Sequence, residues 1–342
     1  GSSNGTFLNG FKLVPNKFYE WRPQSTLSIS TIYITLVQNS TVDAGDFIKS
    51  TIQRIGTSSQ EYLDKLKTKM LDTPNEPDEG IKFLSKISKG GMSEIIKAKF
   101  LDTKEIVAIK IPNSLCVGNQ AALQNFVDEI TMSLHFRHEN VIQTYMRILY
   151  RSNPAMVMEY FPSVTLRSYL LSQTIFDYER LRNIALQIMS GLEYIHGKKI
   201  LHNDIKPSNI LIDDNHHVKI NDFGAAYMVT SKIPKSVIGT VSYMSPDRIN
   251  HGNKKTFYND IYSLGVVLYE MYTKKHPFMM NKSKISTDEI KKTIITGDVL
   301  PPIEVNSDIP TGINDFILRC MHKDSKKRFK NVSEMKAEFQ KH

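Results

Sequence analysis

The stretch LHNDIKPSNILI, residues 201–212, constrains this chain more than any other. Its polar side chains stand one, two and three positions apart: Asn203, Asp204, Lys206 and Asn209. Pro207 prevents an α-helix from running through them, and the apolar run that follows at residues 210–212 predicts a buried strand. A loop this polar directly before a buried strand predicts a site for chemistry and not an ordinary surface turn.

Composition narrows the class of protein. The chain has 342 residues, of which 40% are hydrophobic and 23% are charged, close to the average for soluble globular proteins. No apolar run approaches the ~20 residues that a transmembrane helix needs, and no signal-peptide pattern opens the sequence. Cys116 and Cys320 are far apart and lack histidine partners at metal spacing, so we expect neither a disulfide framework nor a zinc site. These features predict a protein with no membrane association and an intracellular, cytoplasmic location.

The net charge of +9 lies in the larger part of the chain. Residues 1–79 hold 8 Lys/Arg against 9 Asp/Glu, whereas residues 80–342 hold 36 against 26. Such an excess can attract an anionic ligand. The lysines are scattered singly or in pairs without an aromatic-interleaved basic stripe, so we expect no nucleic-acid partner.

Patterning along the chain predicts three regions. Residues 1–37 alternate as strands, with a hairpin signal at Asn9-Gly10, and residues 38–79 predict a helical linker that ends in two prolines. Residues 80–161 predict strands such as EIVAIKI and PAMVMEYF around one helix, AALQNFVDEITMSLHF. Residues 162–342 predict mostly helices, among them RLRNIALQIMSGLEYIH and DIYSLGVVLYEMY. A small β-rich lobe followed by a helical lobe, with a polar loop near their junction, is typical of an α+β protein that binds a ligand in a cleft.

Further polar residues support phosphate chemistry. Asp204, Asn209 and, in the later sequence NDFG, Asp222 are two acids and one amide that can hold hard cations and accept a proton. Lys110 in VAIK is a lone charge on an apolar strand, and a buried lysine there would need Glu129 and a phosphate as anionic partners.

The order of these pieces resembles the protein kinase family over residues 80–342. The matching pieces are VAIK followed by Glu129, HNDIKPSN, DFG, GTVSYMSPD, DIYSLG and the late Arg328. The resemblance implies a bilobal kinase fold with an N-lobe over 80–161 and a C-lobe over 162–342, preceded by the short β-rich segment. It also implies ATP and Mg²⁺ as cofactors and a protein substrate.

The resemblance assigns roles to named residues. Asp204 would accept the proton of the attacking hydroxyl, and Lys206 would neutralise charge on the γ-phosphate. Lys110, paired with Glu129, would hold the α- and β-phosphates. The implied magnesium ligands are Asn209 and Asp222. The implied nucleotide-binding residues are Gly90, Ile95, Ala108, Lys110, Met158, Glu159, Phe161 and Leu211, with the backbone of residues 159–161 pairing with the base.

The lysine at position 206 and Thr240 match the serine/threonine kinase pattern, so we expect transfer to serine or threonine. Three departures accompany this match. The glycine-rich loop SKGGMSEI keeps only the middle glycine, Gly90, which hinders close approach of the backbone to the phosphates. Asn203 stands where the family has an arginine that contacts a phosphate on the activation segment, so we expect activity that does not depend on that phosphate. Asp247 replaces a glutamate and has a shorter reach toward Arg328.

Each feature also has a less specific interpretation. The serines that replace glycines in the glycine-rich loop are compatible with sequence drift that leaves function intact. Glu129 could be a solvated helix residue. Ser231 and Ser236 could be ordinary loop serines without a regulatory role. Four histidines lie close together in the sequence, and for these we favour packing and surface roles over metal binding: His196, His202, His216 and His217.

The N-terminal stretch SSNGTFLNGFKL resembles the second half of a forkhead-associated (FHA) domain, a β-sandwich that binds phosphothreonine. The resemblance rests on Ser3, Asn4 and Asn9-Gly10 and implies a phosphoprotein partner. The first half of such a domain, with its phosphate-binding arginine and serine, does not occur in this chain, and an ordinary hairpin explains the pattern equally well.

We therefore expect an active serine/threonine protein kinase. The main alternative is a pseudokinase scaffold or a phosphopeptide-guided interaction protein, which the degraded glycine loop favours and the complete set of charged site residues opposes. A small-molecule kinase is a third possibility, against which GTVSYMSPD counts because it resembles a platform for peptide substrates.

Overall fold

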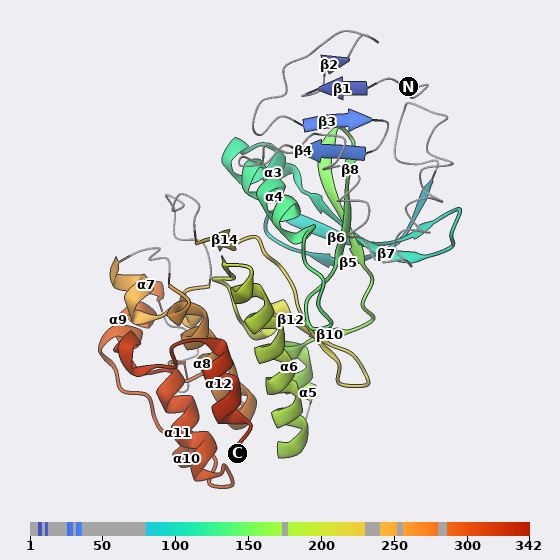
Figure 1. The fold of residues 1–342 in the computed structure, drawn as a ribbon. Coiled ribbons are helices and arrows are strands. Elements are labelled where there is room, and N and C mark those ends of the chain that lie inside the picture. The colour runs from blue at the N-terminus through green and yellow to red at the C-terminus, as the bar shows by residue number, and fades with distance from the viewer. Residues whose placement is uncertain are drawn as a thin grey trace. The chain divides into compact units, whose positions relative to one another are not determined.

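The structure is a computed structural model that describes residues 80–172, 177–229, 240–251, 256–279 and 286–342, together with four strands at residues 6–8, 11–12, 26–29 and 32–35 (Figure 1). The chain divides into two compact units. One consists of Gly1–Lys82, Phe100–Thr103 and Arg147–Ala155, and the other of Phe83–Lys99, Lys104–Met146 and Met156–His342. All the residues of the predicted site belong to the second unit.

The N-terminal strands form an antiparallel sheet in the order β2-β1-β3-β4. They are β1 (Thr6–Leu8), β2 (Phe11–Lys12), β3 (Thr26–Ile29) and β4 (Ile32–Thr35). Phe7 pairs with Lys12 and Leu8 with Phe11, the pairing that a hairpin around positions 9 and 10 requires. Ser3, Asn4 and Asn9-Gly10, on which the FHA resemblance rests, lie outside the described residues, as does the linker predicted over 38–79.

A five-stranded sheet follows, in the order β5-β6-β7-β9-β8. Its strands are β5 (Ile81–Lys89), β6 (Ser93–Phe100), β7 (Ile106–Pro112), β8 (Thr144–Tyr150) and β9 (Asn153–Glu159). Between β7 and β8 lie the helices α3 (Ser114–Val117) and α4 (Gln120–Ser133). Asn119 caps α4, because its side chain accepts a hydrogen bond from the Ala122 amide. The strands EIVAIKI and PAMVMEYF and the helix α4 were predicted from the sequence, whereas the short helix α3 was not.

The remainder is mainly helical. Its helices are α5 (Leu166–Ser172), α6 (Tyr178–Gly197), α7 (Pro246–His251), α8 (Tyr258–Thr273), α9 (Thr287–Thr296), α10 (Pro302–Val305), α11 (Thr311–Cys320) and α12 (Val332–Phe339). Short 3₁₀ turns occupy Pro207–Asn209, Val241–Tyr243 and Ser325–Lys327. Short strands are β10 (Val164–Thr165), β11 (Ile200–Leu201), β12 (Ile210–Ile212), β13 (Val218–Ile220) and β14 (Tyr227–Met228).

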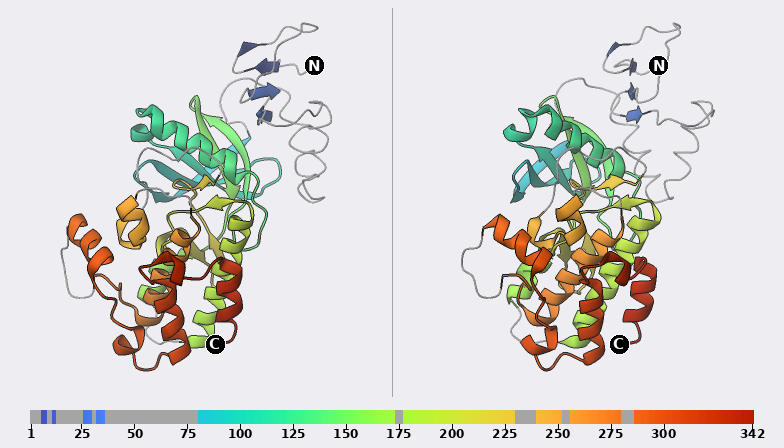
Figure 2. Two further views of the ribbon diagram at one scale, coloured as in Figure 1. Left: turned by 60° about the vertical axis from the view of Figure 1, so that its left-hand side comes forward. Right: turned by 90° about the vertical axis from the view of Figure 1, so that its left-hand side faces the viewer.

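The helical core forms around α6 and α8. Both of the views in Figure 2 show α12 beside α6, and α11 packs on α8. Every residue of α8 from Asn259 to Thr273 is buried, which explains why its sequence is mostly apolar and has no solvent-facing polar stripe. Within the described ranges, none of the helices combines the length and the apolar character needed to cross a lipid bilayer.

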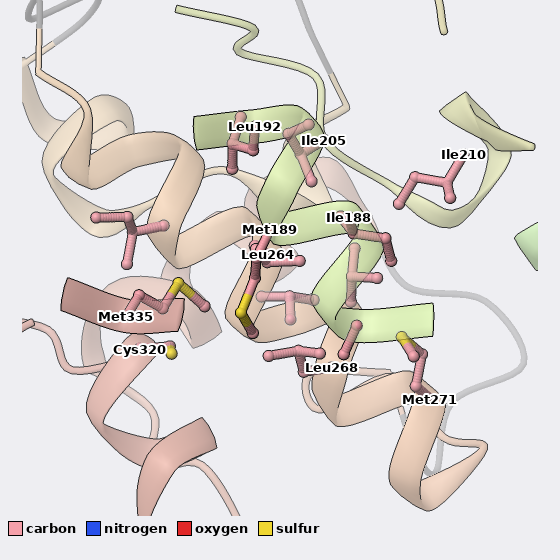
Figure 3. Close-up of a cluster of buried hydrophobic side chains, with 14 of the residues drawn as sticks. Ile188, Met189, Leu192, Ile205, Ile210, Leu264, Leu268, Met271, Cys320 and Met335 are labelled. Atoms are coloured by element: carbon pink, nitrogen blue, oxygen red, sulfur yellow. The ribbon is translucent and has the colours of Figure 1, made fainter. Parts of the chain in front are cut away.

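The polar loop is anchored in this core. Figure 3 shows Ile205 beside Leu192 and Ile210 toward Ile188, two residues of α6, and both loop isoleucines are fully buried. Pro207 opens a 3₁₀ turn, where its missing N–H leaves no donor unpaired. The apolar residues within and after the loop therefore hold its polar side chains in place.

The sequence thus predicts the α+β architecture correctly: a β-sheet lobe followed by a helical lobe. The domain division at residues 37, 79 and 161 stays a prediction.

Candidate active site

The loop between β11 and β12 holds Asp204 in a set of hydrogen bonds. The Lys206 amine lies 2.6 Å from Asp204 Oδ2 and 2.7 Å from Thr240 Oγ1. The Thr240 amide donates to Asp204 Oδ1 at 2.9 Å, and Asn209 Nδ2 donates to Asp204 Oδ2 at 2.9 Å. The structure therefore brings together Asp204, Lys206 and Asn209 with Thr240, which comes from a segment more than 30 positions later. These hydrogen bonds fix the orientation of the Asp204 carboxylate, as a group that accepts a proton requires.

Asp260 of α8 holds the backbone of this loop through two hydrogen bonds. Its Oδ2 accepts the His202 amide at 2.9 Å, and its Oδ1 accepts the Asn203 amide at 2.8 Å. His196 Nε2 lies 2.9 Å from the same Oδ2. Asp260 is fully buried, and although burial opposes ionisation, His196 and the His202 amide lower the pKa of this carboxyl.

The motif DIYSLG is recognisable in the sequence, but no role was predicted for Asp260 within it. The available signal was an acidic residue at the start of an otherwise apolar helix, because a buried charge requires partners.

Lys110, Glu129 and Asp222 form a second charged group. Lys110 Nζ lies 2.5 Å from Glu129 Oε1 and 3.0 Å from Asp222 Oδ1. Lys110 projects from β7 and Glu129 from α4, and both are buried, so Glu129 is not a solvated helix residue. Burial by itself would lower the pKa of Lys110, but the Asp222 and Glu129 carboxylates outweigh it and the pKa is raised. Lys110 therefore remains a cation inside the protein.

Asp222 differs from the other two because its side chain is 44% exposed. The Lys110 charge lowers the pKa of Asp222 to about 2 against the opposing effect of burial. Its backbone adopts a left-handed conformation with φ of 64°, which is uncommon for a residue other than glycine and is often found at functional sites. Asp222 therefore combines a left-handed backbone with a carboxylate whose pKa is lowered and which is partly open to solvent.

An apolar group lies near these charges. Ala108, Ile142 and Met158 are buried together, with Ile95, Tyr160, Phe161 and Leu211 packed against them. Five of these seven residues were predicted as nucleotide-binding, and Tyr160 was predicted as part of the backbone segment that pairs with the base. Ile142 was not singled out, because a single isoleucine in NVIQTY carries no special signal. The Glu159 side chain is not part of this apolar group. Its Oε1 accepts a hydrogen bond from the Gln143 amide at 2.7 Å and lies 3.0 Å from Lys219 Nζ.

The turn between β5 and β6 contains the predicted glycine-rich loop. The Gly90 amide donates to the Ser93 carbonyl at 2.8 Å. Asn113, which follows β7, donates its backbone amide to the Met92 carbonyl at 3.0 Å and its side-chain amide to the Gly91 carbonyl at 2.9 Å. These two hydrogen bonds from Asn113 to the turn were not predicted from the sequence.

Asp247 and Arg328 form the ion pair that the sequence suggested, with 2.9 Å between Oδ2 and Nη2. The Arg328 guanidinium is fully buried and also donates to the carbonyls of His322, Tyr258 and Lys323. The shorter aspartate therefore still reaches its partner.

The histidines take part in packing and hydrogen bonding. His202 Nδ1 accepts the Asp204 amide at 3.3 Å, and burial lowers the pKa of this imidazole. His217 pairs with Asp213 at 3.0 Å on the surface. Among the described residues, no three His, Cys, Asp or Glu side chains gather as a metal-binding group. Cys116 and Cys320 are free and buried in different helices.

Comparison with known proteins gives one consistent result. The family model described as a protein kinase domain matches residues 81–339. A probable serine/threonine-protein kinase of Clostridium perfringens is 31% identical over 258 residues, covering 75% of this chain and 37% of that protein. The serine/threonine-protein kinase PrkC of Bacillus subtilis is 30% identical over 256 residues, covering 74% of this chain and 39% of that protein.

A putative mitogen-activated protein kinase kinase kinase 7-like protein of Drosophila melanogaster is 32% identical over 253 residues, covering 72% of this chain and 63% of that protein. The chain thus spans less than two fifths of the length of the two bacterial relatives.

Proposed function

This chain belongs to the protein kinase family and carries a serine/threonine protein kinase domain, and from that membership we propose that the protein transfers the γ-phosphate of ATP to serine or threonine hydroxyls of other proteins. One observation carries the proposal. Asp204, Lys206 and Thr240 form a closed hydrogen-bonded group, in which the carboxylate that would accept the proton lies beside a lysine that would meet the phosphate.

The proposed reaction is a direct displacement at phosphorus. The substrate oxygen forms a bond to the γ-phosphorus while the bond from phosphorus to the β-phosphate oxygen breaks, and ADP leaves. The hydroxyl proton passes to Asp204. Lys206, 2.6 Å from that carboxylate, neutralises charge on the phosphoryl oxygens during transfer.

Lys110 would position the nucleotide. Its charge is already aligned by Glu129 and Asp222, so binding the α- and β-phosphates needs no rearrangement of the lysine. The apolar residues around Met158 and Ala108 would enclose the base, as expected for a ligand pocket with a few polar groups beside it.

Kinases use a divalent cation, which we propose to be Mg²⁺ held by Asn209 and Asp222. The donor chemistry fits, since both residues offer hard oxygen atoms. Asn209 donates both available Nδ2 bonds toward Asp204, which leaves its Oδ1 for a cation, and Asp222 is charged and partly exposed. The ion would neutralise negative charge on the phosphates.

We also propose that activity does not require phosphorylation of the activation segment, because Asn203 cannot pair with a phosphate as an arginine does. A phosphoprotein contact through residues 1–37 stays a separate prediction.

The test is phosphate transfer from Mg-ATP to a generic basic protein and to the chain itself, followed by phosphoamino-acid analysis. Wild type should produce phosphoserine or phosphothreonine, and Asp204→Ala should abolish the product while retaining the thermal shift caused by Mg-ATP. Absence of both transfer and thermal shift in wild type would favour a scaffold without catalysis. Phosphotyrosine as the only product would contradict the proposed specificity.

A further inference from the structure

Arg248 of α7 is a buried cation next to the catalytic loop. Only 3% of the residue is exposed, and its Nη1 donates a hydrogen bond to the backbone carbonyl of Asn203. Asn203 immediately precedes Asp204. A buried guanidinium is rare without a specific role, because its desolvation must be offset by partners.

The peptide groups at Asn203 are held from two sides. Its amide donates to Asp260 Oδ1 of α8 at 2.8 Å, while its carbonyl accepts from Arg248 of α7. Between these two contacts the residue adopts a left-handed conformation with φ of 62°. Asparagine enters this conformation more readily than most residues with a side chain, and the two contacts hold its peptide groups there.

The short helix that carries Arg248 is itself anchored. Ser245 Oγ donates to Asn259 Oδ1 of α8 at 2.7 Å, and the Arg248 amide donates to Ser245 Oγ at 3.2 Å. The guanidinium therefore comes from a fixed position and can determine where the Asn203 carbonyl lies.

Nearby charges favour this location. Burial lowers the pKa of Arg248, while the Asp260 carboxylate, the Tyr227 hydroxyl and the Asp204 carboxylate oppose that effect. An arginine remains protonated under these conditions. Its positive charge thus interacts with both Asp260, the acid that holds the loop, and Asp204, the acid proposed to accept the proton.

We propose that Arg248 is a positioning residue for phosphate transfer, holding the Asn203 carbonyl so that Asp204 points toward the substrate. Resting on the proposed function, this inference adds an internal device that sets the catalytic loop from α7. A protein with such a fixed cation needs no added phosphate group to order this loop.

Hydrogen exchange measured by mass spectrometry tests the contact without relying on activity. In Arg248→Met, amides in peptides covering residues 200–209 should exchange roughly 10- to 100-fold faster, the effect of losing one hydrogen bond from a charged donor. Peptides covering α11, at Thr311–Cys320, should be unchanged. Arg319→Met is the matched control, because Arg319 is 44% exposed and pairs with Glu334 away from this loop.

Kinetics provide the second readout. Arg248→Met should lower kcat by roughly 10- to 100-fold while the KM for ATP changes less than about threefold, because ATP binding uses other residues. Arg248→Lys keeps the charge but not the forked geometry of the guanidinium, so its kcat should lie between those of wild type and Arg248→Met. If Arg248→Met does not fold, Arg248→Lys and Arg248→Gln carry the same test.

Unchanged exchange over residues 200–209, or equally faster exchange over α11, would overturn the inference, the latter by indicating a general loss of stability. If wild type transfers no phosphate, the proposed function fails while the exchange measurement still decides whether Arg248 orders the loop.

Discussion

The side-chain amide of Asn113 donates a hydrogen bond to the backbone carbonyl of Gly91, with 2.9 Å between the two atoms. The Oδ1 atom of the same side chain accepts the Cys116 amide at 3.1 Å and so caps α3. One residue therefore connects the turn between β5 and β6 to the start of a helix. This connection restrains a loop that has lost two of the three glycines expected there.

Replacing Asn113 should weaken nucleotide binding. In Asn113→Ala the Gly91 carbonyl loses its donor, worth about 1 kcal/mol, so we expect the KM for ATP to rise about fivefold with little change in kcat. Asn113→Ser separates the two roles, because serine can still cap α3 but is too short to reach Gly91. It should retain the thermal stability of wild type and show the raised KM; a normal KM in both variants would refute the tether.

Replacing Arg328 should destabilise the protein more than replacing Asp247, its partner in the ion pair. Arg328→Met removes a fully buried cation and leaves three carbonyls without their donor, so we expect a loss of about 3–5 kcal/mol in the free energy of unfolding. Asp247→Asn should cost only about 1–2 kcal/mol, because Asp247 is 25% exposed and Arg328 keeps its carbonyl partners. Urea denaturation measures both values, and equal losses would contradict this account.

The charge on Asp222 predicts how stability depends on pH. The Lys110 charge lowers the pKa of Asp222 from 3.8 to about 2, so its stabilising contribution is present above the unfolded value and is lost as pH falls toward 2. We expect the difference in unfolding free energy between wild type and Asp222→Asn to be constant from about pH 5 to 7 and to shrink below about pH 4. A difference that changes between pH 6 and 7 would assign the effect to another group.

Close packing between α8 and α11 makes Gly265 sensitive to any side chain. An added Cβ would lie 2.7 Å from the Cys320 Cβ and 2.9 Å from the Met321 Cγ. Gly265→Ala should therefore destabilise the protein by about 1–3 kcal/mol in a thermal or urea unfolding experiment. Gly197→Ala is the matched control, since nothing lies within 4 Å of its added Cβ and alanine favours helices. A stable Gly265→Ala would mean that the two helices can separate at little cost.

The sequence by itself determined the class of fold and the identity of the charged residues. Helical periodicity in α6 and α8 and the apolar strand after Pro207 depend on local spacing, which the chain shows directly. Asp204, Lys206 and Asn209 could likewise be identified from a linear motif, because they lie within six positions of one another.

Only the tertiary structure decided which of these residues meet and what holds them. Lys110 pairs with Glu129 across 19 positions and with Asp222 across 112. The Lys110–Glu129 pair was expected because a buried lysine needs an anionic partner, whereas the Lys110–Asp222 contact was not predicted, since no local pattern encodes it. Asp260, Asn113 and Arg248 contribute through contacts with backbone groups of distant segments. A backbone carbonyl or amide has no residue-specific signature, so sequence reasoning missed all three, and folding alone brings them to the loop and the turn that they hold.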